Sequence, residues 1–158
     1  MDGLALGGGA ELALSCHAIV ATHRSSMGFP ETGIGIYPGL GGTQRLTRRL
    51  GLGLARFYIY TGSFIGARDL AKLNIAAEVV AVEDFNEALK RTLEAHSKQA
   101  SVELGSLDGD TQTLAKWLSE VPAATLLKGE AEEPEELKGL KILKKISHKA
   151  PLAIGMVE

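Results

Sequence analysis

Glycine crowds the first third of the chain, and this constrains the fold more than any other feature of the sequence. Twelve of the 19 glycines lie between Gly3 and Gly53. Glycine adopts left-handed backbone conformations and lets two backbones approach closely, so this density is typical of tight turns around short elements. The second half is richer in Lys, Glu and Leu, with apolar residues at helical spacing. The pattern predicts a turn-rich front part and a helical back part.

Hydrophobic periodicity and turn residues predict the following elements. Strands are expected at 18–22, 27–29 and 77–82, and helices at 10–16, 43–50, 54–60, 67–73, 83–98, 111–121 and 150–158, with a basic amphipathic stretch at 137–147. Thr43 is the expected N-cap and Gly51 the expected C-cap of the helix at 43–50. Thr61 and Gly62 are expected to end the helix that follows.

Composition excludes several classes of protein. A chain of 158 residues that is 45% hydrophobic is long enough for one domain. A net charge of −2 provides no basic field for nucleic acid, and no apolar run is long enough to span a membrane. Cys16 is the only cysteine, so no intrachain disulfide can form, and we expect a cytoplasmic location. No cluster of metal ligands stands out, so no metal is expected.

The first segment with chemical meaning is Gly7-Gly8-Gly9, which precedes an expected helix. Free N–H groups at a helix N-terminus, with the positive end of the helix dipole behind them, suit a developing oxyanion. Close packing alone also explains such a run of glycines, and the run by itself does not separate the two interpretations.

The second segment is the loop Phe29-Pro30-Glu31-Thr32-Gly33. Its carboxyl group, like that of Glu11, is carried among apolar residues. Burial raises the proton affinity of a carboxyl group, which suits acid–base work near neutral pH. The alternative is that Glu11 only interacts with its helix dipole and that Glu31 lies on the surface.

Three stretches together resemble the crotonase superfamily of enoyl-CoA hydratases and isomerases. They are GLALGGGAELALSC, FPETGIGIYPGLGGTQRL and TGSFIGARDLAKL, and the resemblance covers residues 3–82. It implies an α/β, crotonase-like (ClpP/crotonase) β-β-α spiral that is N-terminally truncated. Residues 1–82 would form a partial spiral core with the active-site motifs, and residues 83–158 a helical C-terminal region.

The resemblance also implies a site and a reaction. Glu11 and Glu31 match the pair of glutamates that position water in hydratases, and Gly8 matches one backbone donor to the thioester oxyanion. Gly7, Gly9, Pro30 and Gly39 complete the expected oxyanion and substrate-binding set. The expected reaction is hydration of an enoyl-CoA thioester, with coenzyme A as part of the substrate and no separate cofactor.

Several features depart from the resemblance or leave alternatives open. His17 stands where the family commonly has aspartate, which we interpret as a structural substitution. The second oxyanion donor belongs to an earlier strand and loop that this chain does not contain, so we expect the chain alone to be nearly inactive. An isomerase, a 3-hydroxyacyl-CoA hydrolase and a non-catalytic oligomerisation module are the alternatives.

The resemblance finally implies partners. Family members form trimers or hexamers through the helical C-terminal part, and some are fused to a dehydrogenase domain. Lys141, Lys144, Lys145 and Lys149 form a basic stretch that either meets the phosphates of coenzyme A or is simply solvated.

Overall fold

Two small sheets organise the first half of the molecule. The computed structural model describes residues 1–96 and 107–149. In the first sheet, β1 (Leu4–Leu6) pairs in parallel with β3 (Ser26–Gly28), which pairs antiparallel with β4 (Ile65–Gly66). In the second, β2 (Val20–Thr22) pairs in parallel with β5 (Glu78–Val80). Each strand has only two or three residues, as expected where turns crowd the sequence.

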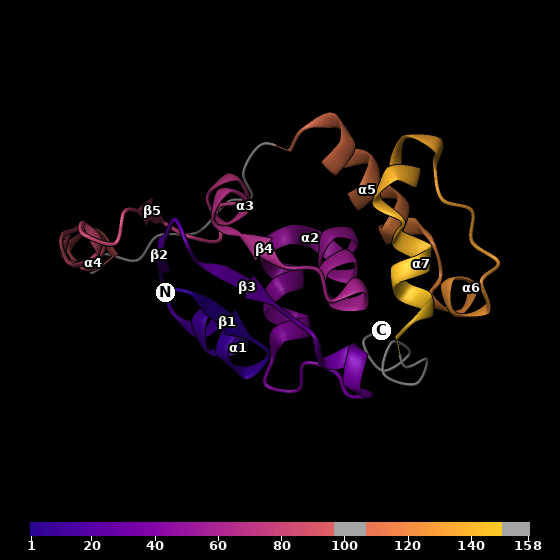
Figure 1. Cartoon of the computed structure of the whole chain (residues 1–158), viewed down its shortest axis with the longest axis horizontal. Coiled ribbons are helices and arrows are strands. Elements are labelled where there is room, and N and C mark those ends of the chain that lie inside the picture. Colours follow the sequence, from indigo (N-terminus) through magenta and orange to yellow (C-terminus); the bar gives the residue numbers. More distant parts are fainter. Residues whose placement is uncertain (97–106, 150–158) are drawn as a thin grey trace.

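Helices surround these sheets. They are α1 (Gly8–Ser15), α2 (Gly42–Thr61), α3 (Ala67–Lys72), α4 (Phe85–His96), α5 (Gly109–Glu120), α6 (Ala123–Lys128) and α7 (Ile142–Ser147), with 3₁₀ turns η1 (Glu31–Ile34) and η2 (Glu135–Leu140). In Figure 1, α2 occupies the centre, α4 lies beside β5 at one end, and α5, α6 and α7 lie together at the other. No helix in the described ranges has the length and apolar character needed to cross a bilayer.

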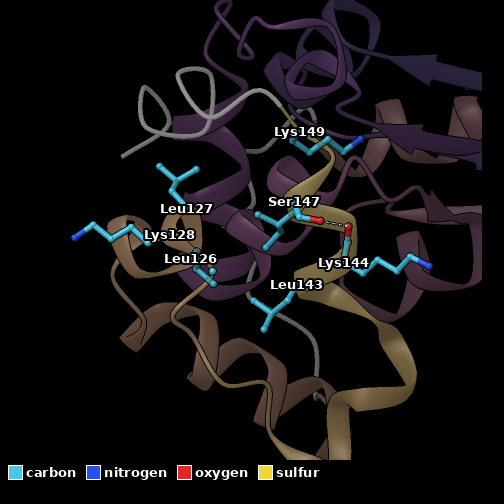
Figure 2. A pocket seen from close by; sticks show the side chains of 9 residues that line it. Leu126, Leu127, Lys128, Leu143, Lys144, Ser147 and Lys149 are labelled. Atoms are coloured by element: carbon cyan, nitrogen blue, oxygen red, sulfur yellow. Dashed lines mark hydrogen bonds between the residues drawn. The ribbon is translucent and has the colours of Figure 1, made fainter.

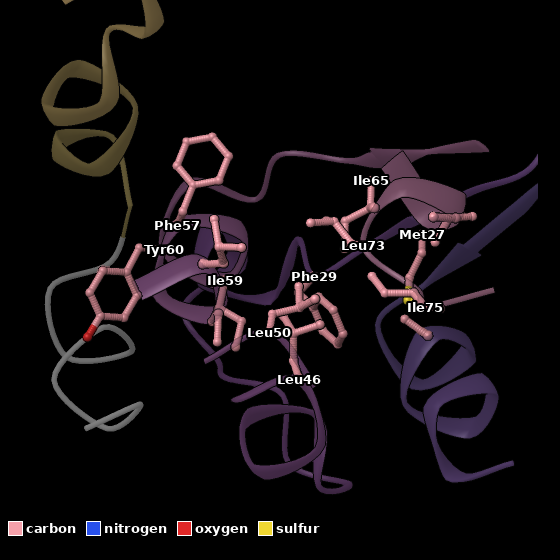
Figure 3. Close-up of a cluster of buried hydrophobic side chains, with 14 of the residues drawn as sticks. Met27, Phe29, Leu46, Leu50, Phe57, Ile59, Tyr60, Ile65, Leu73 and Ile75 are labelled. Atoms are coloured by element: carbon pink, nitrogen blue, oxygen red, sulfur yellow. The ribbon is translucent and has the colours of Figure 1, made fainter. Parts of the chain in front are cut away.

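The core lies between α2 and the strands. Phe29, which follows β3, faces Leu46 and Leu50 of α2, and all three side chains are at most 2% exposed (Figure 3). Tyr60 and Ile59 extend this core along the same helix. Burial of large side chains stabilises the fold by roughly 1.5–3 kcal/mol each, so α2 ties the segment that follows β3 to the rest of the molecule.

The contact between α2 and α5 is the most extensive between elements of the described residues. Gly53 is buried in it, and a Cβ there would lie 1.7 Å from the carbonyl oxygen of Ala115. The guanidinium of Arg56 donates to the carbonyls of Leu118 and Val121 at the end of α5, at 2.9 and 3.0 Å. The division of the chain at residue 82 into a partial spiral core and a helical C-terminal region stays a prediction.

One of the expected helix ends is wrong. The element α2 begins at Gly42 rather than after Thr43, with Gly41 in the left-handed region (φ 95°) as its N-cap. The break expected at Gly51 is confirmed, because its backbone is non-helical (φ 77°, ψ 164°) and α2 consists of two helical segments joined by a kink at this residue. The end at Gly62 is confirmed (φ 63°).

Other differences concern very short elements. The sequence did not predict β1 or α6, and the stretch at 137–147 is divided by Lys141, whose φ is 51°. The strands expected at 18–22, 27–29 and 77–82 are present in shorter form or shifted by a residue. The helix expected at 150–158 and the end of the one expected at 83–98 lie outside the described residues.

Candidate active site

Two neighbouring parallel strands bring both glutamates to one edge of a sheet. β1 and β3 pair in parallel with Leu6 opposite Gly28. β1 leads directly into α1, which carries Glu11 in its first turn, and β3 leads into η1, which begins at Glu31. Carboxyl ends of neighbouring parallel strands lie side by side, and sites commonly form there. The fold therefore gathers residues that are 20 positions apart in the sequence.

Gly7 is the junction between β1 and α1. Its φ is 52°, which favours glycine. Its N–H donates to the carbonyl of Gly28 at 2.9 Å, and its carbonyl accepts from the N–H of Glu11 at 3.0 Å. A Cβ on Gly7 would lie 3.1 Å from Oε1 of Glu31. The carboxyl group of Glu31 thus lies directly against the start of α1.

Gly8 and Gly9 are the first residues of α1 and are exposed. Within residues 1–96 and 107–149, the N–H of Gly8 donates to no backbone or side-chain acceptor, as expected for the first turn of a helix. Free N–H groups and the positive end of the helix dipole attract negative charge. The glycine run therefore fits both interpretations, close packing and oxyanion binding. Gly7 permits close packing, and Gly8 keeps a free N–H donor.

Glu31 is buried, so the alternative of a surface glutamate is wrong. The residue is 7% exposed, and its Oε2 atom has no hydrogen-bond partner among the described residues. Burial raises the pKa of this carboxyl group above its usual value, and the negative charge of Glu11 raises it further. The two carboxyl groups are therefore close enough to interact electrostatically, and both burial and the charge of Glu11 disfavour ionisation of Glu31.

Glu11 is held in place by the loop before α2. Its side chain is 3% exposed, and its Oε1 atom accepts from the N–H of Leu40 at 2.8 Å and of Gly42 at 2.7 Å. A Cβ on Gly42 would lie 2.9 Å from Oε1 and Cγ of Glu11. Sequence reasoning missed these two donors. The only signal was the Gly41-Gly42 pair, which permits the close approach.

The raised pKa of Glu31 predicts a pH-dependent effect of Glu31→Gln on stability. Between the usual pKa of glutamate and the raised pKa of the native state, the native state keeps a proton that the unfolded state releases. The free energy of unfolding therefore falls as pH rises through this window. Glutamine does not titrate, so the variant escapes this loss. The free energy of unfolding of Glu31→Gln minus that of the unsubstituted chain is therefore expected to be more favourable at about pH 8 than at about pH 4. Urea unfolding at both values measures the difference.

The control for this prediction is Glu130→Gln, which changes an exposed glutamate. Its stability relative to the unsubstituted chain is expected to be the same at both pH values. An equal effect of Glu31→Gln at the two values would contradict the prediction.

The remaining predicted site residues, Pro30 and Gly39, lie near Glu11 and Glu31 in the sequence of the site, but no contact of theirs defines a role. Pro30 is the N-cap of η1 and so precedes Glu31 directly. Gly39 is exposed in the loop that leads to the Leu40 N–H. His17 is exposed after α1 and lines a different hollow, beside α4. In the described residues no cluster of three or more His, Cys, Asp or Glu suits a metal ion.

The lysines of the C-terminal region lie around two shallow hollows. Figure 2 shows Lys144 and Lys149 from α7 and the residues after it, beside Leu126 and Leu127 of α6. A neighbouring hollow of about 610 Å³ is lined by Lys141 and Lys145 together with Thr61 of α2. Contact between these lysines and coenzyme A stays a prediction.

Comparisons with known proteins identify the family of the chain. A family model described as enoyl-CoA hydratase/isomerase matches residues 1–150. The chain is 41% identical over 91 residues to a crotonyl-CoA hydratase of Syntrophomonas wolfei, covering 58% of this chain and 35% of that protein. It is 41% identical over 101 residues to a peroxisomal bifunctional enzyme of Danio rerio, covering 64% of this chain and 14% of that protein.

A solved structure extends the comparison to the fold. An enoyl-CoA hydratase subunit from Geobacillus kaustophilus superposes with a TM-score of 0.55 and 32% identity, over 91% of this chain and 49% of that one. The fold is thus the crotonase-like α/β fold expected from the sequence. The chain belongs to the enoyl-CoA hydratase/isomerase family. It spans about a third of the length of the S. wolfei relative and about half of that solved structure.

Proposed function

We propose that this chain carries the acid–base half of an active site that adds water across the α,β double bond of an enoyl-CoA thioester. The observation that carries the proposal is the buried Oε2 of Glu31, which has no hydrogen-bond partner within residues 1–96 and 107–149 and lies beside the start of α1. Glu11 lies in the first turn of that helix. The crotonyl-CoA hydratase among the relatives supports this choice of reaction and substrate.

The geometry suggests a distinct role for each group. The thioester oxygen would accept from the free N–H of Gly8, where the helix dipole stabilises the charge that develops on it. The oxygen of water would bond to the β-carbon while its proton passes to Glu11, whose orientation is set by two backbone N–H donors. The α-carbon would take a proton from Glu31, whose pKa is raised by burial. No cofactor beyond the coenzyme A of the substrate takes part.

Two carboxyl groups in one site favour hydration over the alternatives. An isomerase needs only one carboxyl group to move a proton. The 3-hydroxyacyl-CoA hydrolases of the family that the sequence resembles usually lack the glutamate matching Glu11. A non-catalytic module needs no buried carboxyl group without a hydrogen-bond partner, which costs free energy in a purely structural role.

The test compares two forms of the protein. The first is the 158-residue chain. The second, called the extended form here, carries the N-terminal part of the S. wolfei relative ahead of Met1 and so supplies the second oxyanion donor. Loss of a single oxyanion donor costs about 10²–10³ in rate, so we expect the chain alone to hydrate crotonyl-CoA slower by at least that factor. The measurement is the loss of ultraviolet absorbance of the conjugated thioester.

Two outcomes would contradict the proposal. Equal rates for the two forms would show that the chain needs no further donor. No hydration by a folded extended form would exclude the reaction itself and leave the isomerase, hydrolase and non-catalytic alternatives.

The partners and the location are proposed on separate grounds. The bifunctional relative supports a longer protein in which this domain is joined to another, such as a dehydrogenase. Assembly into trimers or hexamers through the helical part is proposed from the family, and light scattering of the extended form measures it. A cytoplasmic location is proposed from the single cysteine.

A further inference from the structure

Arg45 lies in the first turn of α2, and its side chain folds back over the loop that precedes this helix. Its Nη1 atom donates to the carbonyl of Leu40 at 2.5 Å. A Cβ on Gly41 would lie 2.3 Å from that nitrogen, so the guanidinium rests directly against the Gly41 backbone. The side chain of Arg45 is therefore half-buried against residues 40 and 41 rather than extended into solvent.

An ion pair does not explain an arginine at this position. Within residues 1–96 and 107–149, no carboxylate makes an ion pair with Arg45. The N-terminus of a helix carries the positive end of the helix dipole, which disfavours a cation in the first turn. The hydrogen bond to the Leu40 carbonyl is the contact that offsets this cost.

Leu40 is held by its backbone from both sides. Its carbonyl accepts from Arg45, and its N–H donates to Oε1 of Glu11 at 2.8 Å. Its side chain is 70% exposed, so packing of that side chain into the core does not fix the residue. The position of the Leu40 N–H therefore depends on the hydrogen bonds that the backbone of this residue makes.

The two glycines after Leu40 let both charged groups approach the loop. Gly41 lies against the guanidinium of Arg45, and a Cβ on Gly42 would lie 2.9 Å from Oε1 of Glu11. The N–H of Gly42 donates to the same Oε1 at 2.7 Å. The backbone of residues 40–42 is thus bonded to the guanidinium at one atom and to the carboxyl group of Glu11 at two.

We propose that Arg45 is a positioning residue of the candidate active site. By fixing the carbonyl of Leu40, it keeps the Leu40 N–H on Oε1 of Glu11. It thereby holds this carboxyl group in the orientation in which the carboxyl group takes a proton from water. The inference rests on the proposed function, because it gives Arg45 a part in the same hydration.

The experiment replaces Arg45 by methionine in the extended form. Methionine has a similar length and no donor, so the Leu40 carbonyl loses its partner. We expect kcat for crotonyl-CoA to fall about tenfold or more, because small displacements of a reacting group are costly. KM is expected to change less than about twofold. Contact between this positive charge and the phosphates of coenzyme A would instead raise KM.

A double-mutant cycle with Glu11→Gln tests whether Arg45 acts through Glu11. Residues that act through one group give non-additive effects. Where position 11 has no carboxylate to orient, Arg45→Met is expected to change kcat less than about twofold. Partial unfolding would lower kcat equally in both backgrounds, so the cycle separates positioning from a purely structural role.

Two further variants complete the test. Arg48→Met removes an exposed cation from the same helix and is expected to leave kcat and KM unchanged. Arg45→Lys keeps the positive charge and a shorter donor, enters the same cycle, and is expected to have a kcat between those of Arg45→Met and the unsubstituted form. Thermal unfolding of every variant checks that the chain is folded.

The outcomes distinguish this inference from the proposed function. An unchanged kcat in Arg45→Met overturns the inference and leaves the proposed function standing, as does an equal loss in the two backgrounds or an effect confined to KM. No hydration by the unsubstituted extended form overturns the proposed function, and the role of Arg45 in hydration with it. A loss of kcat that disappears with Glu11→Gln supports the inference.

Discussion

In the extended form, Glu31→Gln is expected to slow the hydration of crotonyl-CoA by about 10²–10⁴-fold, the usual contribution of a positioned acid or base. Glutamine fills the same buried space but cannot give a proton to the α-carbon. Its neutral amide is also expected to leave the fold intact, because burial already disfavours the charged form of the carboxyl group that it replaces. The substitution thus removes the chemistry with little change in packing.

Glu11→Gln is expected to lower the rate by a similar factor. The amide oxygen can still accept from the N–H groups of Leu40 and Gly42, so the side chain should stay in place. What it loses is the ability to take a proton from water. A reaction that needs both carboxyl groups is lost with either change, whereas double-bond isomerisation through a single group survives one of them.

The control is Glu130→Gln in the same extended form, which is expected to leave the rate unchanged because this glutamate is exposed in the C-terminal region. The rate constants are measured at saturating crotonyl-CoA, and isomerisation of a β,γ-unsaturated thioester is measured in parallel. Full hydration activity in either Glu11→Gln or Glu31→Gln would sink the proposed mechanism.

Among the described glycines outside the active site, Gly53 is expected to be the one at which substitution by alanine destabilises the chain most. The new Cβ would lie 1.7 Å from the carbonyl oxygen of Ala115 and 2.5 Å from its carbonyl carbon. Both are backbone atoms, so no rotation of a side chain relieves the overlap, and α5 must move away from α2. We expect a loss of about 3 kcal/mol or more in the free energy of unfolding, which lowers the melting temperature by roughly 6–12 °C.

Gly109→Ala provides a matched control on the other helix of the pair. Gly109 is the first residue of α5, its added Cβ meets no atom within 4 Å, and its φ lies outside the left-handed region. Alanine there is expected to be neutral or slightly stabilising, because it reduces the conformational freedom of the unfolded chain. Circular dichroism melts of both variants make the comparison. Equal melting temperatures would mean that α2 and α5 do not pack this closely.

Elements with a long, regular pattern were predictable, while very short ones were not. The amphipathic helices at α4 and α5 follow apolar spacing that any tertiary environment can use. β1 has three residues, too few for a period to show, and it exists because β3 pairs with it. Gly51, by contrast, was predictable as a helix end from local rules, and its backbone is non-helical in the structure (φ 77°, ψ 164°).

The sequence by itself determined the family resemblance and the pair Glu11 and Glu31, because glycine runs and carboxyl groups in apolar segments are local features. Only the tertiary structure decided their chemistry. The raised pKa of Glu31 depends on its burial in the folded chain, and the orientation of Glu11 depends on N–H groups about 30 positions further along the chain. Local sequence cannot encode such contacts, since a carboxyl group takes its proton affinity from whatever the folded chain places around it.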